Sequence, residues 1–310
     1  MGYSIASTCL RIDDYVYGEP GLCLANQIQY ELLMASVNPR VLPGYRLSLG
    51  YTMFYMSLLV LIPLAGIYLK SFTITWSEFL KAAWTPRAIA AYKLTFGASV
   101  TAAGANIFIG LLLAWVLVRY DFPLKRFFDA LIDLPFALPT AVAGLVYSTL
   151  YAENGWYGRF LAPLGIEGNN TRLGIVLVLI FTGMPFVVRT VQPVLESLDV
   201  EVEEAATTLG ASRFQVFLHI IWPTLMPATL TGFALAFARA LGEYGSVIFI
   251  AGNRAGETEI APILVMNRLL ELDDSGKLAA IAIAVVLLTV SFLMLAFINL
   301  LEWWSKRRGA

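Results

Sequence analysis

Long apolar runs alternate with short polar segments along most of this chain. Six runs are long enough to cross the membrane as helices, because about 20 residues span about 30 Å of hydrocarbon. They lie near 49–69, 94–118, 130–151, 173–192, 224–250 and 278–301. The pattern predicts an all-α integral membrane protein with six transmembrane helices. Pro135 and Pro139 should kink the third run, since each removes a backbone hydrogen bond.

The polar segment 194–223 is too long and too regularly patterned to be a turn between two spans. Asp199 is a good N-cap, and three glutamates follow it in the first turns, where the helix dipole favours negative charge. Gly210 is suited to a left-handed stop at the helix end. Val202 and Leu209 recur at helical spacing and give this element a small apolar stripe.

A second helix is predicted directly after this stop. Ser212 and Gln215 have the spacing of a capping box, and Pro223 is expected to break or bend the helix before the next span. The segment therefore predicts a helix, a glycine hinge and a second helix across one mouth of the protein. An interfacial helix resting on lipid headgroups is the alternative, but the acidic face of the first helix would repel anionic lipid.

Basic residues indicate the orientation. Arg119, Lys125 and Arg126 surround a short loop, and Lys306, Arg307 and Arg308 lie close to the end of the chain. The positive-inside rule places both clusters in the cytoplasm. With six spans, the N-terminus and the segment 193–223 also lie inside, and the loops near 70–93, 152–172 and 251–277 lie outside.

Composition excludes several classes of function. The 310 residues are 58% apolar and 14% charged, whereas a soluble domain is roughly a quarter charged. The net charge of −1 gives no reason to expect a nucleic-acid partner. One histidine and two cysteines are too few to predict a metal site, and no cofactor is expected. The chain has no Gly-x4-Gly-Lys phosphate loop, so any ATP must be hydrolysed by another chain.

Residues 1–45 have neither a helical period nor enough apolar side chains to bury a core. We expect a disordered tail there and a transmembrane domain over 46–310. A second hypothesis is that translation starts at Met34 and that the preceding residues are not made. No cleavable signal peptide is visible, so the first span is expected to act as the targeting signal.

The segment 194–223 carries a recognisable motif, which reads Glu204-Ala205-Ala206-x3-Gly210-x9-Ile220-x2-Pro223, with Leu209 before the glycine. It resembles the coupling loop of ABC-importer permeases, where a cytoplasmic helix seats in a groove of the ATPase subunit. Trp222 stands where that family usually has leucine. The resemblance implies the type I importer architecture of methionine and molybdate permeases, and it makes the chain a transporter subunit rather than an enzyme.

The run from Gly232 to Asn253 is similar to the sulfate/thiosulfate permeases, and in particular to their T subunit. Molybdate permeases tend to read Glu-Phe-Gly-Ala where this chain reads Glu243-Tyr244-Gly245-Ser246. The resemblance implies sulfate or thiosulfate import in a bacterial inner membrane, with both termini cytoplasmic. The implied partners are a second permease, two copies of an ATPase and a periplasmic binding protein. Molybdate or tungstate transport is the alternative, and a passive anion channel is the alternative from another class.

Two further groups of residues are candidates for function. Arg239 and Glu243 lie one turn apart within the membrane, where charge is costly, so we expect them to pair. The pair either lines the anion pathway or is a structural ion pair between helices. By the family resemblance, the loop with Gly252, Asn253 and Glu257 contacts the binding protein.

The fifth run also carries a strip of small residues, which are Ala228, Gly232, Ala236 and Ala240. Their spacing of four places them on one helix face and lets another helix approach closely. The approaching helix belongs either to a partner subunit or to another span of this chain.

Overall fold

The computed structural model describes residues 45–271 and 273–308. The expected tail and the hypothesis of a start at Met34 concern residues that lie outside these ranges. The described residues are helices joined by turns and loops, without a strand. The chain separates into two units, with the boundary between Ala65 and Gly66.

The first apolar run is helical throughout its predicted length. It comprises α3 (Tyr45–Met56), the π turn η1 (Ser57–Leu61) and α4 (Ile62–Ser71). The stretch Leu47–Ser71 is long and apolar enough to span a membrane, as predicted.

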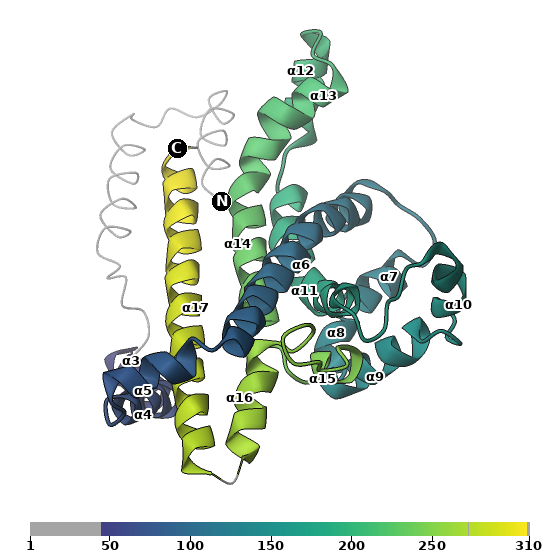
Figure 1. Ribbon diagram of the computed structural model, residues 1–310. Helices are drawn as coiled ribbons and strands as arrows, with labels where there is room; N and C mark the ends of the chain where they lie inside the picture. Colours follow the sequence, from purple (N-terminus) through teal and green to yellow (C-terminus); the bar gives the residue numbers. More distant parts are fainter. Residues whose placement is uncertain (1–44, 272, 309–310) are drawn as a thin grey trace, which may run out of the picture. The chain divides into compact units, whose positions relative to one another are not determined.

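Three long helices form the centre of the second unit. They are α6 (Pro86–Arg119), α11 (Arg172–Glu196) and α14 (Trp222–Leu241), and they pack against one another (Figure 1). Each of the first two begins at a threonine whose hydroxyl accepts a backbone N–H, from Ala88 to Thr85 at 3.2 Å and from Gly174 to Thr171 at 3.3 Å. Their shared core is made of aliphatic and aromatic side chains from all three helices.

Small residues let these three helices approach closely. A Cβ added at Gly110 of α6 would lie 2.7 Å from a methyl carbon of Val187 on α11, and one added at Gly232 of α14 would lie 2.9 Å from the Val187 Cα. The strip of small residues on the fifth run therefore packs, at Gly232, against α11 of the same chain. This answers the question of which helix approaches it there.

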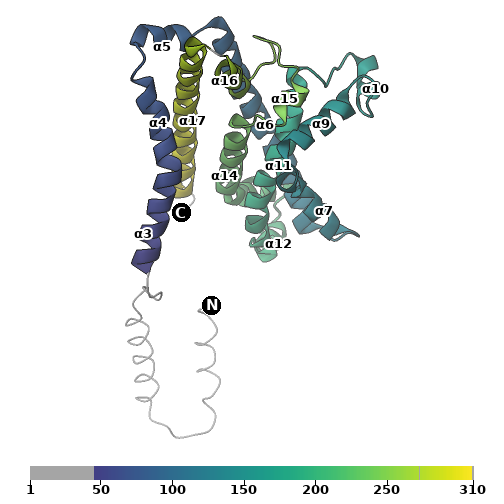
Figure 2. The same cartoon turned by 90° about the horizontal axis from the view of Figure 1, so that it is seen from below.

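The third predicted span is not one continuous helix. It consists of α7 (Lys125–Ile132), α8 (Leu134–Ala137) and α9 (Thr140–Tyr151). Pro135 falls in the first turn of α8 and Pro139 directly precedes α9, so both prolines start new helices instead of kinking one. Figures 1 and 2 show these helices beside α11, on the side away from α14.

The fifth predicted span is also interrupted. Its helix ends at Leu241, five residues pass without regular helix, and α15 (Val247–Ile250) follows. Gly242 has no side chain that could continue the apolar face. The Glu243 carboxylate accepts hydrogen bonds from Ser246, three residues later. Within the described residues, five helices are long and apolar enough to cross a membrane. The count of six stays a prediction.

The remaining helices are α5 (Trp76–Ala83), α10 (Gly158–Leu161), the 3-10 turn η2 (Ala162–Leu164), α12 (Val200–Thr208), α13 (Arg213–Val216), the π turn η3 (Phe217–Ile221), α16 (Ala261–Leu270) and α17 (Asp274–Arg308). They include one more long helix, α17, which packs against α14 and α16 (Figure 1).

Contacts between segments that are distant in sequence support the predicted grouping into two ends. At one end, Arg119 pairs with Glu203, which joins the end of α6 to the polar segment 194–223. At the other end, Arg87 pairs with Glu259, and Arg254 donates to the Asn170 carbonyl at 3.1 Å. The three loops predicted to lie outside thus share one end of the second unit. Which end faces the cytoplasm remains a prediction.

Candidate functional site

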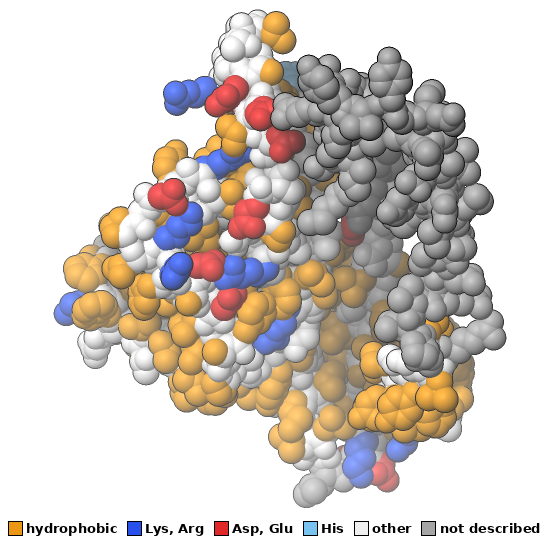
Figure 3. All heavy atoms as spheres, turned by 180° about the vertical axis from the view of Figure 1, so that it is seen from behind, with side chains coloured by type: hydrophobic (Ala, Val, Ile, Leu, Met, Phe, Trp, Pro, Cys, Tyr) orange, Lys and Arg blue, Asp and Glu red, His pale blue; other side chains and the backbone are white. Residues whose placement is uncertain are grey.

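The polar segment forms a projection beyond the end of α14, which we call the tip and define as residues 199–216 (Figure 1). Asp199 has the predicted N-cap position and an extended backbone, but its side chain makes no cap hydrogen bond. Gly210 has φ of +89°, which confirms the predicted left-handed stop. Acidic side chains gather on this projection in the space-filling view (Figure 3).

The hydrogen bonds at Gly210 close the end of α12 completely. The Gly210 N–H donates to the Thr207 carbonyl at 3.0 Å, and the Ala211 N–H donates to the Ala206 carbonyl at 3.1 Å. This is the full Schellman pattern. The predicted capping box follows directly, with Ser212 N–H donating to Gln215 Oε1 at 2.8 Å and Gln215 N–H donating to Ser212 Oγ at 3.3 Å.

The helix that begins at Arg213 does not end at Pro223. It runs on to Leu241, and the π turn at Phe217–Ile221 lies directly before α14. Pro223 is the second residue of α14 and therefore lies inside this continuous helix. The hinge of this segment is therefore at Gly210 and not at Pro223.

The residues of the coupling motif fall on two sides of the tip. Glu204, Ala205, Leu209 and Gly210 are exposed, and the Leu209 side chain is 89% exposed. Ala206 and Ile220 are partly buried against the core of the three central helices, and Pro223 is exposed at the start of α14. An exposed leucine beside acidic side chains on a preformed projection is suited to contact another protein.

Arg239 and Glu243 form the predicted ion pair at the end of α14. The Glu243 side chain is 1% exposed, whereas that of Arg239 is 33% exposed. The other Glu243 oxygen accepts the Ser246 N–H at 3.0 Å and the Ser246 hydroxyl at 2.8 Å. Glu243 therefore holds the turn that interrupts the fifth run, while the Arg239 side chain stays partly exposed.

The two interrupted runs pack against each other at their breaks. A Cβ at Gly144 of α9 would lie 2.8 Å from the Ser246 Cα, and one at Gly245 would lie 3.2 Å from the Thr140 Cβ. Backbone outside regular helices is tolerated in a membrane protein where it is buried in protein or lines a cavity. Sequence reasoning missed this junction, although Gly144 and Gly245 are the signal that could have indicated it.

At the opposite end, Gly252 and Asn253 shape a turn. Both have positive φ, of +67° and +50°, and Asn253 donates through Nδ2 to the Ile248 carbonyl at 2.8 Å. The Glu257 side chain is 63% exposed and pairs with Arg254 at 3.3 Å. Gly252 and Arg254 also line a recess of about 750 Å³ together with the loop after α9. Glu257 is the member of this predicted group whose side chain is available to a partner.

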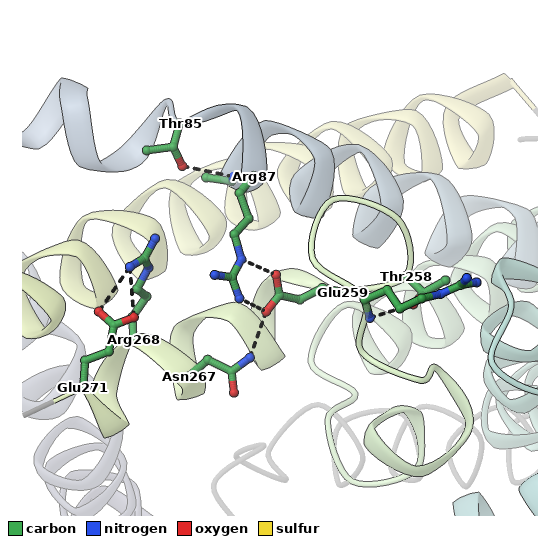
Figure 4. Close-up of polar contacts among 9 residues, drawn as sticks. Thr85, Arg87, Thr258, Glu259, Asn267, Arg268 and Glu271 are labelled. Carbon is green, nitrogen blue, oxygen red and sulfur yellow. Dashed lines mark hydrogen bonds and ion pairs between the residues drawn. The ribbon is translucent and has the colours of Figure 1, made fainter.

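Glu259, two residues further, was not predicted and is the most completely bonded carboxylate at this end. Arg87 donates to its two oxygens at 2.7 Å each, and Asn267 donates at 2.8 Å (Figure 4). Burial raises the pKa of Glu259, but the hydrogen bonds from Arg87 and Asn267 outweigh it, so the pKa lies below its ordinary value. This cluster fixes the start of α6 to the start of α16.

A second unpredicted cluster holds α7 against α11. Arg189 donates to both Asp133 oxygens, at 2.9 and 2.6 Å, and to Asp129 Oδ1 at 2.7 Å. No group of three or more potential metal ligands occurs among the described residues. The clusters described above are ion pairs that join α6 to the segment before α16, join α7 to α11, and hold the break after α14.

Comparison with known proteins places this arrangement in a family. Residues 106–305 match the model of the binding-protein-dependent transport system inner membrane component. The chain belongs to this family. Its members are transport permeases and not enzymes, and permeases of ABC importers work with a binding protein, a second permease and an ATPase.

Curated relatives are similar over most of their length. The chain is 48% identical to the sulfate transport system permease protein CysT of Salmonella typhimurium, over 89% of this chain and 99% of that protein. It is 49% identical to the protein of the same name from Synechocystis, over 83% of this chain and 88% of the relative.

Solved structures agree on the fold of this family member. A bacterial ABC transporter involved in the import of the acidic polysaccharide alginate matches with a TM-score of 0.68 and 16% identity, over 90% of this chain and 98% of that chain. At that identity the likeness shows the fold alone, which is the type I importer permease fold. The tip, the ion pair at the end of α14 and the turn after α15 all lie within the residues that match the family.

Proposed function

We propose that this permease is a membrane subunit of an ATP-driven importer that moves sulfate or thiosulfate into the cytoplasm. The identity of 48% with a sulfate permease, over 99% of that relative, is the observation that carries the substrate. Coupling to an ATPase is supported by the exposed, preformed tip, because a passive channel would not need such a contact surface.

In this proposal the tip docks on the ATPase. Glu204, Ala205 and Leu209 provide the exposed contact, and Ala206, Gly210, Ile220 and Pro223 hold it in shape. Two ATPase copies would bind the tips of this chain and of a second permease. Closure of the ATPase dimer would draw the tips together and open the opposite mouth, and hydrolysis would reset the transporter.

The opposite mouth would receive the anion from a periplasmic binding protein. Glu257 is the proposed contact, and Gly252 and Asn253 set the turn that presents it. In this proposal the tip and both termini lie on the cytoplasmic side of a bacterial inner membrane. The basic residues Arg119, Lys125 and Arg126 lie at the same end of the helices as the tip and agree with this orientation.

Arg239 has two proposed roles, which one variant separates. The Glu243 carboxylate is bonded to the turn, but the Arg239 side chain is partly exposed. Its positive charge could lower the energy barrier for a dianion to cross the membrane. Arg239→Gln should slow uptake without loss of assembly if the arginine lines the pathway. Full uptake with normal assembly would leave it as a structural partner of Glu243.

The proposed function is tested by uptake of labelled sulfate in cells that lack their own sulfate permease and receive this chain with its cognate partners. Excess thiosulfate or molybdate is the competitor. Gly210→Leu is the coupling variant, because leucine at φ of +89° is strained. Gly165→Leu is the matched control, since Gly165 has φ of +70°, has open space around it and lies in a loop away from the tip.

Uptake that thiosulfate suppresses and molybdate does not would support the anion. Loss of ATPase co-purification in Gly210→Leu, with retention in Gly165→Leu, would support the coupling role. Uptake of molybdate without sulfate would reassign the substrate to molybdate or tungstate. Uptake that needs no ATPase would instead indicate a passive anion channel.

A further inference from the structure

The helix α12 is weakly held by side-chain packing. It contains no buried residue, and Ala206 is its one side chain packed against the core of the central helices. A methyl group buries little area, so packing alone gives α12 little resistance to rotation. Whatever fixes its orientation must come from the chain connections at its two ends and from polar contacts.

One polar contact ties α12 to a helix that is distant in sequence. Arg119, the last residue of α6, donates through its terminal guanidinium nitrogen to Glu203 Oε1, across 84 residues of sequence. The two side chains are only 16% and 21% exposed. An ion pair shielded in this way is screened less by salt than a surface pair.

Arg119 is itself held by aromatic side chains. Its Cζ lies 5.5 Å from the centroid of the Trp115 ring, and this ring meets Phe217 of the π turn edge-on, with 6.1 Å between centroids. The Arg119 cation lies at the C-terminal end of α6 and the Glu203 carboxylate in the first turn of α12, so both helix dipoles favour the pair. The guanidinium is thus fixed on α6 before it meets the tip.

The pair gives α12 a third point of attachment. The chain connects α12 to α11 through residues 197–199 and to α14 through Gly210 and α13. Two attachments define an axis about which a helix can turn, and a third attachment away from that axis prevents the turn. The central helices α6, α11 and α14 therefore each hold α12 once.

There is room for the turn that the pair prevents. A recess of about 330 Å³ lies beneath α12, lined by Glu203, Thr207, Arg213 and Phe217 among others. Without the ion pair, α12 could rotate into this space. Its displacement would then not be transmitted to α6, α11 and α14.

We propose that Arg119 and Glu203 are positioning residues that lock α12 to α6, so that movement of the tip is transmitted to α6 as well as to α11 and α14. This inference rests on the proposed coupling function for the origin of the movement. The attachment of α12 is a separate, structural claim and can be measured without transport.

The experiment uses the purified complex of this chain with its partner subunits. Amide hydrogen exchange over residues 200–208, without nucleotide, reports the attachment, and anion transported per ATP hydrolysed reports its use. Arg119→Gln and Glu203→Gln each break the pair. Glu201→Gln is the matched control, because it removes an exposed carboxylate from the same first turn of α12.

We expect both pair-breaking variants to raise exchange over α12 about fivefold or more and to lower transport per ATP, and Glu201→Gln to change neither. The double variant Arg119→Gln with Glu203→Gln should exchange no faster than either single variant, because all three lack the same pair. Unchanged exchange in both single variants would overturn the inference, and so would a double variant whose effect is the sum of the two single effects. If sulfate uptake is absent in the wild type but exchange responds as expected, the attachment stands and the proposed substrate fails.

Discussion

The junction between the two interrupted runs is most directly tested at Gly144. Replacing this glycine with alanine adds a Cβ that would lie 2.8 Å from the Ser246 Cα and closer still to the Ser246 carbonyl oxygen. Real Cβ atoms essentially never approach other atoms so closely, and the obstacle is backbone, which cannot move aside by changing a rotamer. The helix α9 and the turn after α14 must therefore separate.

The expected size of the effect follows from two opposing terms. Alanine in place of glycine within a helix gains about 1 kcal/mol, and overpacking a filled site costs about 3 kcal/mol at the upper end of its range. The net loss is about 2 kcal/mol. For a domain of about 250 residues, this corresponds to a fall in Tm of about 4–8 °C.

Gly104→Ala is the matched control, because Gly104 also lies in a helix and a Cβ there meets nothing within 4 Å. It should keep or slightly raise the Tm. The assay heats the detergent-purified chain and measures the monodisperse fraction by size-exclusion chromatography. Equal heat stability of the two variants would refute the reasoning that the two breaks are packed backbone to backbone.

Three further predictions concern side chains. Glu259→Gln should lower the stability by about 1 kcal/mol, because the half-exposed Arg87 loses its charged acceptor. Since the pKa of Glu259 is lowered in the folded chain, its contribution is present above the ordinary glutamate pKa and is lost as pH falls through the lowered value. Thermal scans across acid pH should show this dependence in the wild type and a weaker one in the variant. Arg189→Gln should cost about 1 kcal/mol and speed proteolysis of residues 125–132, whereas Arg126→Gln, at an exposed site, should not. Leu209→Ala should change stability by less than about 0.5 kcal/mol but reduce ATPase co-purification, and a large loss of stability would contradict its exposed position.

The sequence predicts the elements of this fold where the signal is local. Gly210 and the pair Ser212 and Gln215 were identified because a left-handed stop and a capping box need only residues within a few positions of one another. Continuous apolar runs likewise predicted the helices α6, α11 and α17. The prediction of one continuous span each near 130–151 and 224–250 was wrong. The mean hydropathy of an apolar segment is the same whether or not its helix is interrupted.

What the sequence could not provide is contact between distant residues. The pair of Arg87 with Glu259 joins positions 172 apart, and Arg119 with Glu203 joins positions 84 apart. Nothing in either neighbourhood marks the partner, because the choice among several arginines and glutamates is made by helix packing. Arg239 and Glu243 were predicted to pair only because one helical turn separates them.

The closed hydrogen bonding of the tip has a consequence for how it is recognised. Its backbone bonds at Gly210 and its capping box are all made between residues 206 and 215, so the tip needs no partner to hold its shape. A protein that docks there meets a preorganised surface and loses little conformational entropy of the tip backbone on binding. Binding and release can then be repeated at each cycle without the tip unfolding.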